Sequence, residues 1–163
     1  MVPKTPEQLQ SRLTELGLEC ETISHQPVFT VEESQSERGN MPGGHSKNLF
    51  LKDKKGVLWL VVCEEDRPVD MKALRKVIGA ANLSFGKPDL LLEVLGITPG
   101  SVTPFALIND REQKVRVVLD AGLMAHTELH FHPLTNAATT RISPDDLLVF
   151  IRSCGHQPEI VEI

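Results

Sequence analysis

The sequence predicts an α+β protein with a mixed, mostly antiparallel sheet surrounded by helices. Short apolar runs bounded by turn residues alternate with stretches whose apolar residues recur at helical spacing. Composition agrees with this class, because 40% of the 163 residues are hydrophobic and 24% are charged. We therefore expect one domain spanning residues 1–163, large enough to bury its own core.

Several helices are predicted from caps, prolines and leucine spacing. Thr5 and the proline after it suit a helix start, and the leucine pattern ends at Gly17. Thr30 and Glu33 have the spacing of a capping box, which predicts a short helix. The remaining predicted helices span residues 70–78 and 88–95 and a stretch that begins at Ser143.

Strands are predicted where apolar runs lie between polar turns. One hairpin joins residues 47–52 to 57–63, and a second joins residues 105–109 to 115–120. Shorter strands are expected at residues 19–25, at residues 139–142 and, along a sheet edge, at residues 159–163.

Composition narrows the possible functions. A net charge of −5 creates no overall basic field, so an RNA partner would have to be held by a local patch. The three cysteines lie far apart without a CxxC pair, which argues against structural zinc and for a reducing compartment. No signal-peptide pattern is present, and no apolar run approaches the ~20 residues of a membrane span. We expect a cytoplasmic protein without membrane association.

The histidines and acidic residues give no diagnostic catalytic motif. His130 and His132 would face the same side of a strand, but no HExxH motif or third ligand accompanies them. A metal site is therefore disfavoured, His130 is interpreted as structural, and His132 could point into a cleft. No GxSxG elbow or cysteine signature predicts a covalent hydrolase, and the acidic run at residues 64–66 is typical of a solvated turn.

Two segments could bind a ligand. Lys47 stands where a glycine-containing loop becomes an apolar strand, beside Asn48. A lysine at this place is either a solvated strand end or a cation that faces phosphate or a polarised carbonyl, and local chemistry permits both. The segment GITPGSVTP, residues 96–104, is stiff enough to aim main-chain groups at a ligand, although its spacing also suits an ordinary connection.

Four blocks together resemble the YbaK/ProX family of aminoacyl-tRNA editing domains. They are PVFTVEE, PGGHSKNLFLKDKKG, LSFGKPDLLLEVLGITPGSVTPFALIND and FHPLTNAATTRISPDDLL, in the expected order over nearly the whole chain. Within the family they are most similar to the free-standing alanyl-tRNA(Pro) deacylases. The resemblance implies a single YbaK/ProX-like domain that removes alanine from mischarged tRNA(Pro), in a pocket that admits alanine and excludes proline. Water would attack the ester with help from the ribose 2′-hydroxyl, with no cofactor or metal.

The resemblance also implies site residues and partners. The implied catalytic residues are Lys47, Gly100 and His132. The implied substrate-binding residues are Asn48, Phe29, Thr30, Ser101, Val102, Thr103, Pro104, Asn136 and Thr139. The acceptor end of mischarged tRNA(Pro) is the expected partner of a monomer, with prolyl-tRNA synthetase and elongation factor Tu as further suggested partners. Lysines and arginines at positions 52, 54, 55, 75 and 76 could form the local RNA-binding patch.

Three alternatives stay open at this point. The same fold could serve a deacylase for Cys-tRNA(Pro) or a serine-type substrate, since sequence does not give pocket volume. It could also serve as a non-catalytic module that binds tRNA or a synthetase. A metal-dependent hydrolase would require stoichiometric zinc.

Overall fold

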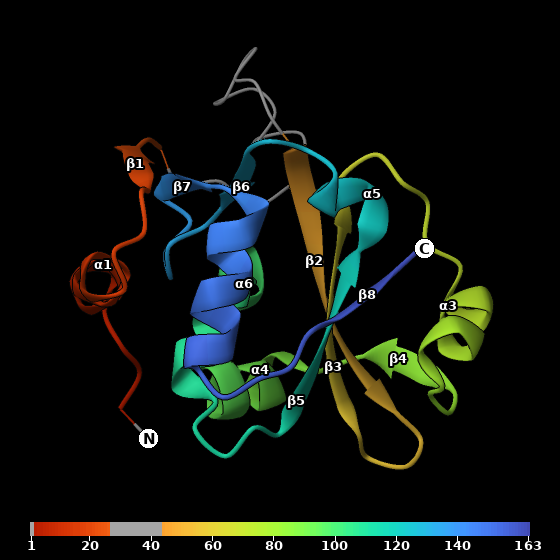
Figure 1. The fold of residues 1–163 in the computed structure, drawn as a ribbon. Coiled ribbons are helices and arrows are strands. Elements are labelled where there is room, and N and C mark those ends of the chain that lie inside the picture. The colour runs from red at the N-terminus through yellow and green to blue at the C-terminus, as the bar shows by residue number, and fades with distance from the viewer. Residues whose placement is uncertain (1, 27–43) are drawn as a thin grey trace.

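The computed structural model describes residues 2–26 and 44–163, and it shows the expected α+β arrangement (Figure 1). The strands are β1 (Glu21–Ser24), β2 (Gly44–Asp53), β3 (Leu58–Glu64), β4 (Leu83–Phe85), β5 (Val115–Asp120), β6 (Leu129–Phe131), β7 (Ala138–Ile142) and β8 (Glu159–Val161). The α-helices are α1 (Pro6–Glu15), α3 (Met71–Ile78), α4 (Pro88–Leu95), α5 (Ala121–Met124) and α6 (Pro144–Ser153). Two 3₁₀-helices are η1 (Pro99–Ser101) and η2 (Pro104–Asn109). The predicted helix at residues 30–39 lies outside the described residues.

The sheet is mixed, with the order β1-β7-β6-β2-β3-β5-β8 and with β4 paired to β2 beside this path. The pairs β1–β7, β2–β3, β2–β4 and β6–β7 are antiparallel. The pairs β2–β6, β3–β5 and β5–β8 are parallel. The first predicted hairpin is confirmed as β2–β3, and β8 lies at a sheet edge as expected.

Local capping signals placed the helix ends correctly. Thr5 caps α1 through a capping box, Asp70 caps α3 by accepting from the main-chain N–H of Lys72, and Ser143 caps α6. Each cap satisfies a main-chain donor that the first helical turn leaves free. None of the helices in the described part of the chain is long and apolar enough to cross a membrane.

The second predicted hairpin is wrong. Residues 105–109 belong to the 3₁₀-helix η2, and β5 pairs in parallel with β3, where Val117 lies beside Leu60. The apolar run after Pro104 has no alternation, so its sequence suits a buried helix as well as a strand. Pro104 and the Thr103 hydroxyl, which accepts from the main-chain N–H of Phe105 at 3.3 Å, start the helical turn.

Two apolar clusters cover the two faces of the central strands. The larger cluster includes Leu9 of α1 and residues of α4, η2 and α6, whereas the smaller includes Trp59 and Leu74 of α3. Figure 1 shows α4 and α6 on one side of the central strands and α3 on the other. At the centre of the larger cluster, the edge of Phe105 meets Phe131 at 6.0 Å and Phe150 at 5.3 Å between ring centroids.

Replacing Phe105 by Ala should lower the free energy of unfolding by about 3–5 kcal/mol, because the fully buried ring leaves a cavity between two other rings. Urea unfolding measures this loss. Phe85→Ala is the matched control, since that ring is 64% exposed and its removal should cost much less. Equal losses for the two variants would contradict the central role of Phe105.

Candidate functional site

A small cavity of about 50 Å³ opens where β2 and β6 run side by side. Its lining residues come from β2, from β6 and the residue after it, and from β7. They are His45, Ser46, Asn48, His130, Phe131, His132 and Thr139. The parallel register pairs His45 with His130, and their rings stack with centroids 4.7 Å apart. Backbone pairing therefore sets the separation of the two walls.

His132 is held as an uncharged ring with one nitrogen available. Its Nδ1 lies 3.2 Å from the carbonyl oxygen of Ala138, and since a carbonyl only accepts, Nδ1 carries the hydrogen. Burial lowers the pKa of His132 below its ordinary 6.5, the bond to Ala138 opposes this shift, and the nearby His25 adds to it. At neutral pH, Nε2 therefore keeps a lone pair that can accept a hydrogen bond.

Thr139 is fixed by a second histidine. His25 lies at the end of β1, where its Nδ1 donates to the carbonyl oxygen of Gln26 at 2.7 Å. Its Nε2 lies 2.8 Å from the Thr139 hydroxyl, so a neutral His25 accepts the hydroxyl hydrogen. The Thr139 oxygen is left with lone pairs, which makes it an acceptor in the cavity wall.

Asn48 presents an unsatisfied acceptor. Its Nδ2 donates to the Ser46 hydroxyl at 3.3 Å, whereas its Oδ1 is buried and has no hydrogen-bond partner among the described residues. Leaving a buried acceptor unpaired costs about 1–3 kcal/mol. Such an atom is suited to a donor brought by a ligand, for example an ammonium group or a hydroxyl.

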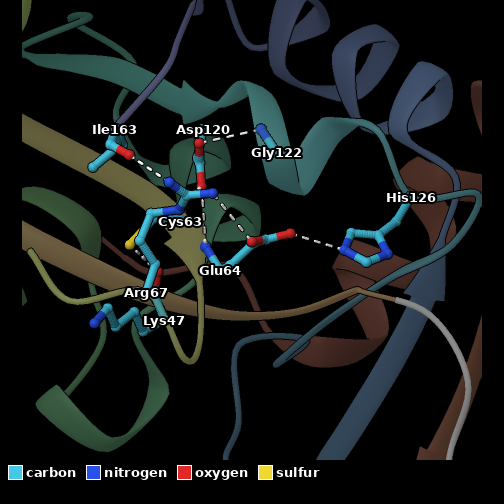
Figure 2. Close-up of polar contacts among 8 residues, drawn as sticks. All are labelled: Lys47, Cys63, Glu64, Arg67, Asp120, Gly122, His126 and Ile163. Carbon is cyan, nitrogen blue, oxygen red and sulfur yellow. Dashed lines mark hydrogen bonds and ion pairs between the residues drawn. The ribbon is translucent and has the colours of Figure 1, made fainter.

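Lys47 lies between these residues but does not line the cavity. Strand alternation turns its side chain to the face opposite Ser46 and Asn48. On that face its partner across the strands is Cys63, whose thiol donates to the Lys47 carbonyl oxygen at 3.9 Å. Figure 2 shows the lysine chain extending away from the neighbouring ion pairs. Its catalytic role stays a prediction.

Of the predicted site residues, Asn48, His132 and Thr139 are brought together in the cavity. Phe29 and Thr30 lie outside the described residues. The others do not line this cavity and stay predictions: Gly100, Ser101, Val102, Thr103, Pro104 and Asn136. The segment that includes Gly100 and Pro104 leads into Phe105, which packs against the lining residue Phe131.

Four residues at the site were missed from the sequence: His25, His45, Ser46 and Phe131. His130 was interpreted as structural, yet it lines the cavity together with His45. The alternation in HFH, residues 130–132, was the available signal for β6. The parallel pairing of β6 with β2 has no local signature.

A polar network lies at the end of β3, next to the part of β2 that carries Lys47 (Figure 2). The Glu64 carboxylate bridges His126 Nε2 at 3.0 Å and Arg67 Nη2 at 3.4 Å. Arg67 also contacts the buried Asp120 through Nε at 3.1 Å and donates to the main-chain oxygen of Ile163 at 2.6 Å. The network therefore connects β3, β5 and the loop that leads into β6.

The end of β3 is also hydrogen-bonded to the main chain of the β2 residues that line the cavity. Glu64 is paired with Ser46, and the N–H of Glu65 donates to the carbonyl oxygen of His45 at 2.9 Å. The solvated turn predicted for residues 64–66 therefore applies only to Asp66, because Glu64 and Glu65 are half-buried. Hydrogen bonding from His126 lowers the pKa of Glu64, and Arg67 adds to this shift against the opposing effect of burial.

Replacing Glu64 by Gln should lower the free energy of unfolding at neutral pH by about 1–2 kcal/mol, because it breaks charge-assisted hydrogen bonds at a partly exposed site. Since the folded pKa of Glu64 lies below its ordinary 4.5, the stabilisation is present above that value and is lost as pH falls through the folded pKa. Urea unfolding at several pH values should show the difference shrinking in acid.

Glu112→Gln is the matched control for this measurement. Glu112 is 76% exposed and contacts Lys114 at 3.2 Å, so its loss should have little effect at any pH. A Glu64→Gln effect that is independent of pH would show that the carboxylate charge does not stabilise the strand end.

In residues 2–26 and 44–163, no group of three or more histidine, cysteine, aspartate and glutamate side chains could hold a metal ion. The cysteines are not activated as nucleophiles either. Burial raises the pKa of Cys63 to about 11 despite the nearby Lys47, and it raises the pKa of Cys20 to about 11.

Comparison with known proteins identifies the family. The sequence model described as the aminoacyl-tRNA editing domain matches residues 25–150, and the chain belongs to this family. It is 42% identical over 158 residues to the prolyl-tRNA synthetase associated domain-containing protein 1 of Bos taurus, covering 94% of this chain and 92% of that protein. It is 36% identical over 154 residues to the prolyl-tRNA editing protein ProX of Acetoanaerobium sticklandii, covering 94% of each.

The fold is also that of a solved structure. The crystal structure of a protein described as a candidate trans-editing enzyme for prolyl-tRNA synthetase matches with a TM-score of 0.74. It covers 100% of this chain and 99% of that chain at 19% identity, which supports the fold alone. The YbaK/ProX resemblance and the fold class expected from the sequence are thereby confirmed.

Proposed function

We propose that the protein hydrolyses the ester that joins alanine to mischarged tRNA(Pro). The observation that carries this proposal is that one small cavity is lined both by Asn48, whose Oδ1 has no hydrogen-bond partner among the described residues, and by His132, whose Nε2 keeps a lone pair. An aminoacyl ester brings an ammonium group, a carbonyl and an attacking water to such a place. An aminoacyl-tRNA as the substrate is supported by membership of the editing family and by similarity to ProX, which is named a prolyl-tRNA editing protein.

The cavity supplies positioning rather than a nucleophile. His132 Nε2 would accept a hydrogen bond from the attacking water, while Asn48 Oδ1 would accept from the alanine ammonium. The water oxygen adds to the carbonyl carbon, and the bond to the ribose oxygen then breaks. That oxygen takes a proton, with the neighbouring 2′-hydroxyl assisting, and free alanine and a tRNA with a free terminal hydroxyl are released.

Lys47 and the segment from Gly100 to Pro104 complete the proposal. Because the Lys47 side chain lies on the other face of β2 from Asn48, its ammonium is suited to a phosphate of the acceptor end. Gly100 lies in η1 and does not line the cavity, so a contact of its main chain with the aminoacyl group is an expectation of the same proposal. Cytoplasmic location and binding to prolyl-tRNA synthetase or elongation factor Tu remain expectations of the same proposal.

Pocket size supports a small amino acid. A volume of about 50 Å³ has room for a few water-sized groups, so it suits a methyl side chain and a water better than a proline ring. Ser46 and Thr139 make part of the lining polar, and serine or cysteine is therefore the alternative substrate. A synthetase site built for proline cannot strongly reject the smaller alanine. A second site that admits alanine and excludes proline by volume is therefore needed to remove the error.

The deciding experiment is deacylation of labelled Ala-tRNA(Pro), with Pro-, Cys- and Ser-tRNA(Pro) alongside. Wild type should release alanine alone. Asn48→Ala and Lys47→Ala should each slow the single-turnover rate about 10- to 100-fold, the loss of one hydrogen bond to a charged group. Lys114→Ala, in an exposed turn, is the matched control and should leave the rate unchanged.

The outcomes separate the candidate functions. Faster release of serine or cysteine than of alanine would move the substrate to the alternative deacylase. If no ester is cleaved faster than in buffer while tRNA still binds, the protein is a non-catalytic binding module.

The pH dependence tests His132. Because burial lowers the pKa of His132 below 6.5, the rate should hold steady as pH falls through that value and decline only where Nε2 takes a proton. His132→Gln should be slower and should lack this acid limb, since an amide does not titrate. A pH–rate profile corrected for uncatalysed hydrolysis measures both. The same acid limb in the variant would assign it to another group.

A further inference from the structure

His25, the residue that follows β1, contacts β7 and its flank on both sides of Ala138. Its main-chain N–H donates to the carbonyl oxygen of Ala137 at 2.8 Å, and its ring Nε2 lies 2.8 Å from the Thr139 hydroxyl. The carbonyl oxygen of Ala138 in turn accepts from His132 Nδ1. His25 is not among the residues that line the cavity, so it can act on a ligand only through the residues that it holds.

The ring of His25 has a defined direction of hydrogen bonding. Its Nδ1 lies 2.7 Å from the carbonyl oxygen of Gln26, and a carbonyl only accepts, so Nδ1 carries the ring hydrogen. A neutral imidazole has one N–H, so Nε2 is an acceptor and the Thr139 hydroxyl donates to it. The hydroxyl hydrogen is thereby engaged by His25, and only the lone pairs of the Thr139 oxygen remain for a ligand.

The cavity wall therefore offers hydrogen-bond acceptors where a ligand would meet Asn48 and Thr139. Asn48 Oδ1 is buried without a partner among the described residues, while its Nδ2 donates to the Ser46 hydroxyl. None of the described residues that line the cavity carries a carboxylate, so a cationic ligand would depend on these neutral oxygens.

Two fixed acceptors discriminate between an amine and a hydroxyl. An α-ammonium group has three N–H donors and no lone pair, so it can donate to both oxygens at once. An α-hydroxyl has a single hydrogen, so one of the two oxygens would stay unpaired, which disfavours the hydroxy compound. His132 Nε2 is left for the attacking water, as in the proposed reaction.

We propose that His25 is a positioning residue that makes the cavity select an α-ammonium group over an α-hydroxyl group. It does so by holding the hydrogen of the Thr139 hydroxyl, which fixes Thr139 and Asn48 as a pair of acceptors. For the identity of the ester, this inference rests on the proposed function. Without His25, the Thr139 hydroxyl can rotate and donate into the cavity, and a hydroxy acid is then accepted more readily.

The test compares hydrolysis of alanyl-tRNA(Pro) with that of lactyl-tRNA(Pro), in which a hydroxyl replaces the ammonium. It is made at about pH 7, above the ordinary histidine pKa of about 6.5 and below the α-amino value of about 7.7–8.0. The wild-type ratio of the two single-turnover rates, alanyl over lactyl, should fall about 10-fold in His25→Leu, the effect of one hydrogen bond to a charged group.

A conservative variant and a double variant show whether His25 acts through Thr139. In His25→Gln the amide oxygen can accept the Thr139 hydrogen in place of Nε2, so part of the wild-type ratio should return. Thr139→Val should lower the ratio as His25→Leu does, and the double variant should lower it no further, because both residues act through one bond. Additive losses would contradict this shared route.

Thr22→Val is the matched control. The Thr22 and Thr140 hydroxyls are 2.7 Å apart across the same pair of strands, and neither residue lines the cavity. This variant should unfold at lower urea concentration but keep the wild-type ratio of rates. If it lowers the ratio as His25→Leu does, or if His25→Leu slows both esters equally, His25 is only structural and the proposal is overturned.

The nitrogen-15 NMR signals of the His25 ring test the direction of the hydrogen bond without any variant. At neutral pH the hydrogen should reside on Nδ1, and a neutral ring with its hydrogen on Nε2 would overturn the proposal.

Amide-linked alanyl and lactyl analogues of adenosine, which resist hydrolysis, separate this inference from the proposed function. Wild type should bind the alanyl analogue more tightly, and His25→Leu should lose most of this preference. If wild type cleaves no ester but shows this His25-dependent preference, the proposed function fails and the selection of an ammonium stands. If wild type releases alanine while neither the ratio of rates nor the ratio of affinities changes in His25→Leu, the role of His25 fails and the enzyme proposal stands.

Discussion

The parallel pairing of β2 with β6 is the constraint on which the candidate site depends. It joins His45 to His130 in register and brings Ser46 and Asn48 into the same cavity as Phe131 and His132. Strand β2 also pairs with β3 from Ser46 to Lys52 on one edge and with β4 from Leu51 to Asp53 on the other, so the strand is fixed on both sides of the cavity. Main-chain hydrogen bonds, and not flexible side chains, therefore set the width of the cavity.

Strand alternation separates two electrostatic environments on β2. The cavity face carries uncharged groups, among them the neutral ring of His132 and the open acceptor of Asn48. The opposite face carries Lys47, near the buried thiol of Cys63 and the ion pairs of Glu64 and Arg67. Polar groups held in fixed orientation are suited to a ligand whose charge develops during a reaction, whereas the lysine on the opposite face is suited to an anion.

Local signals in the sequence predicted well where helices begin and where the first hairpin forms. They predicted less well which strands lie next to each other in the sheet. The caps at Thr5, Asp70 and Ser143 marked helix starts correctly, because a cap acts within a single turn. The β2–β3 hairpin was also predictable from its polar turn. Residues 105–109 were mistaken for a strand, because an apolar run without alternation fits either a strand or a buried helix.

The sequence by itself determined the helix starts at Thr5, Asp70 and Ser143, the first hairpin and, through long blocks in register, the family to which the chain belongs. Only the tertiary structure decided that β5 runs parallel to β3, that His45 stacks on His130 and that Glu64 is bound by Arg67 and His126. The physical reason is range. Caps and turns act between residues a few positions apart, whereas a parallel pair joins distant segments and depends on how the whole core packs.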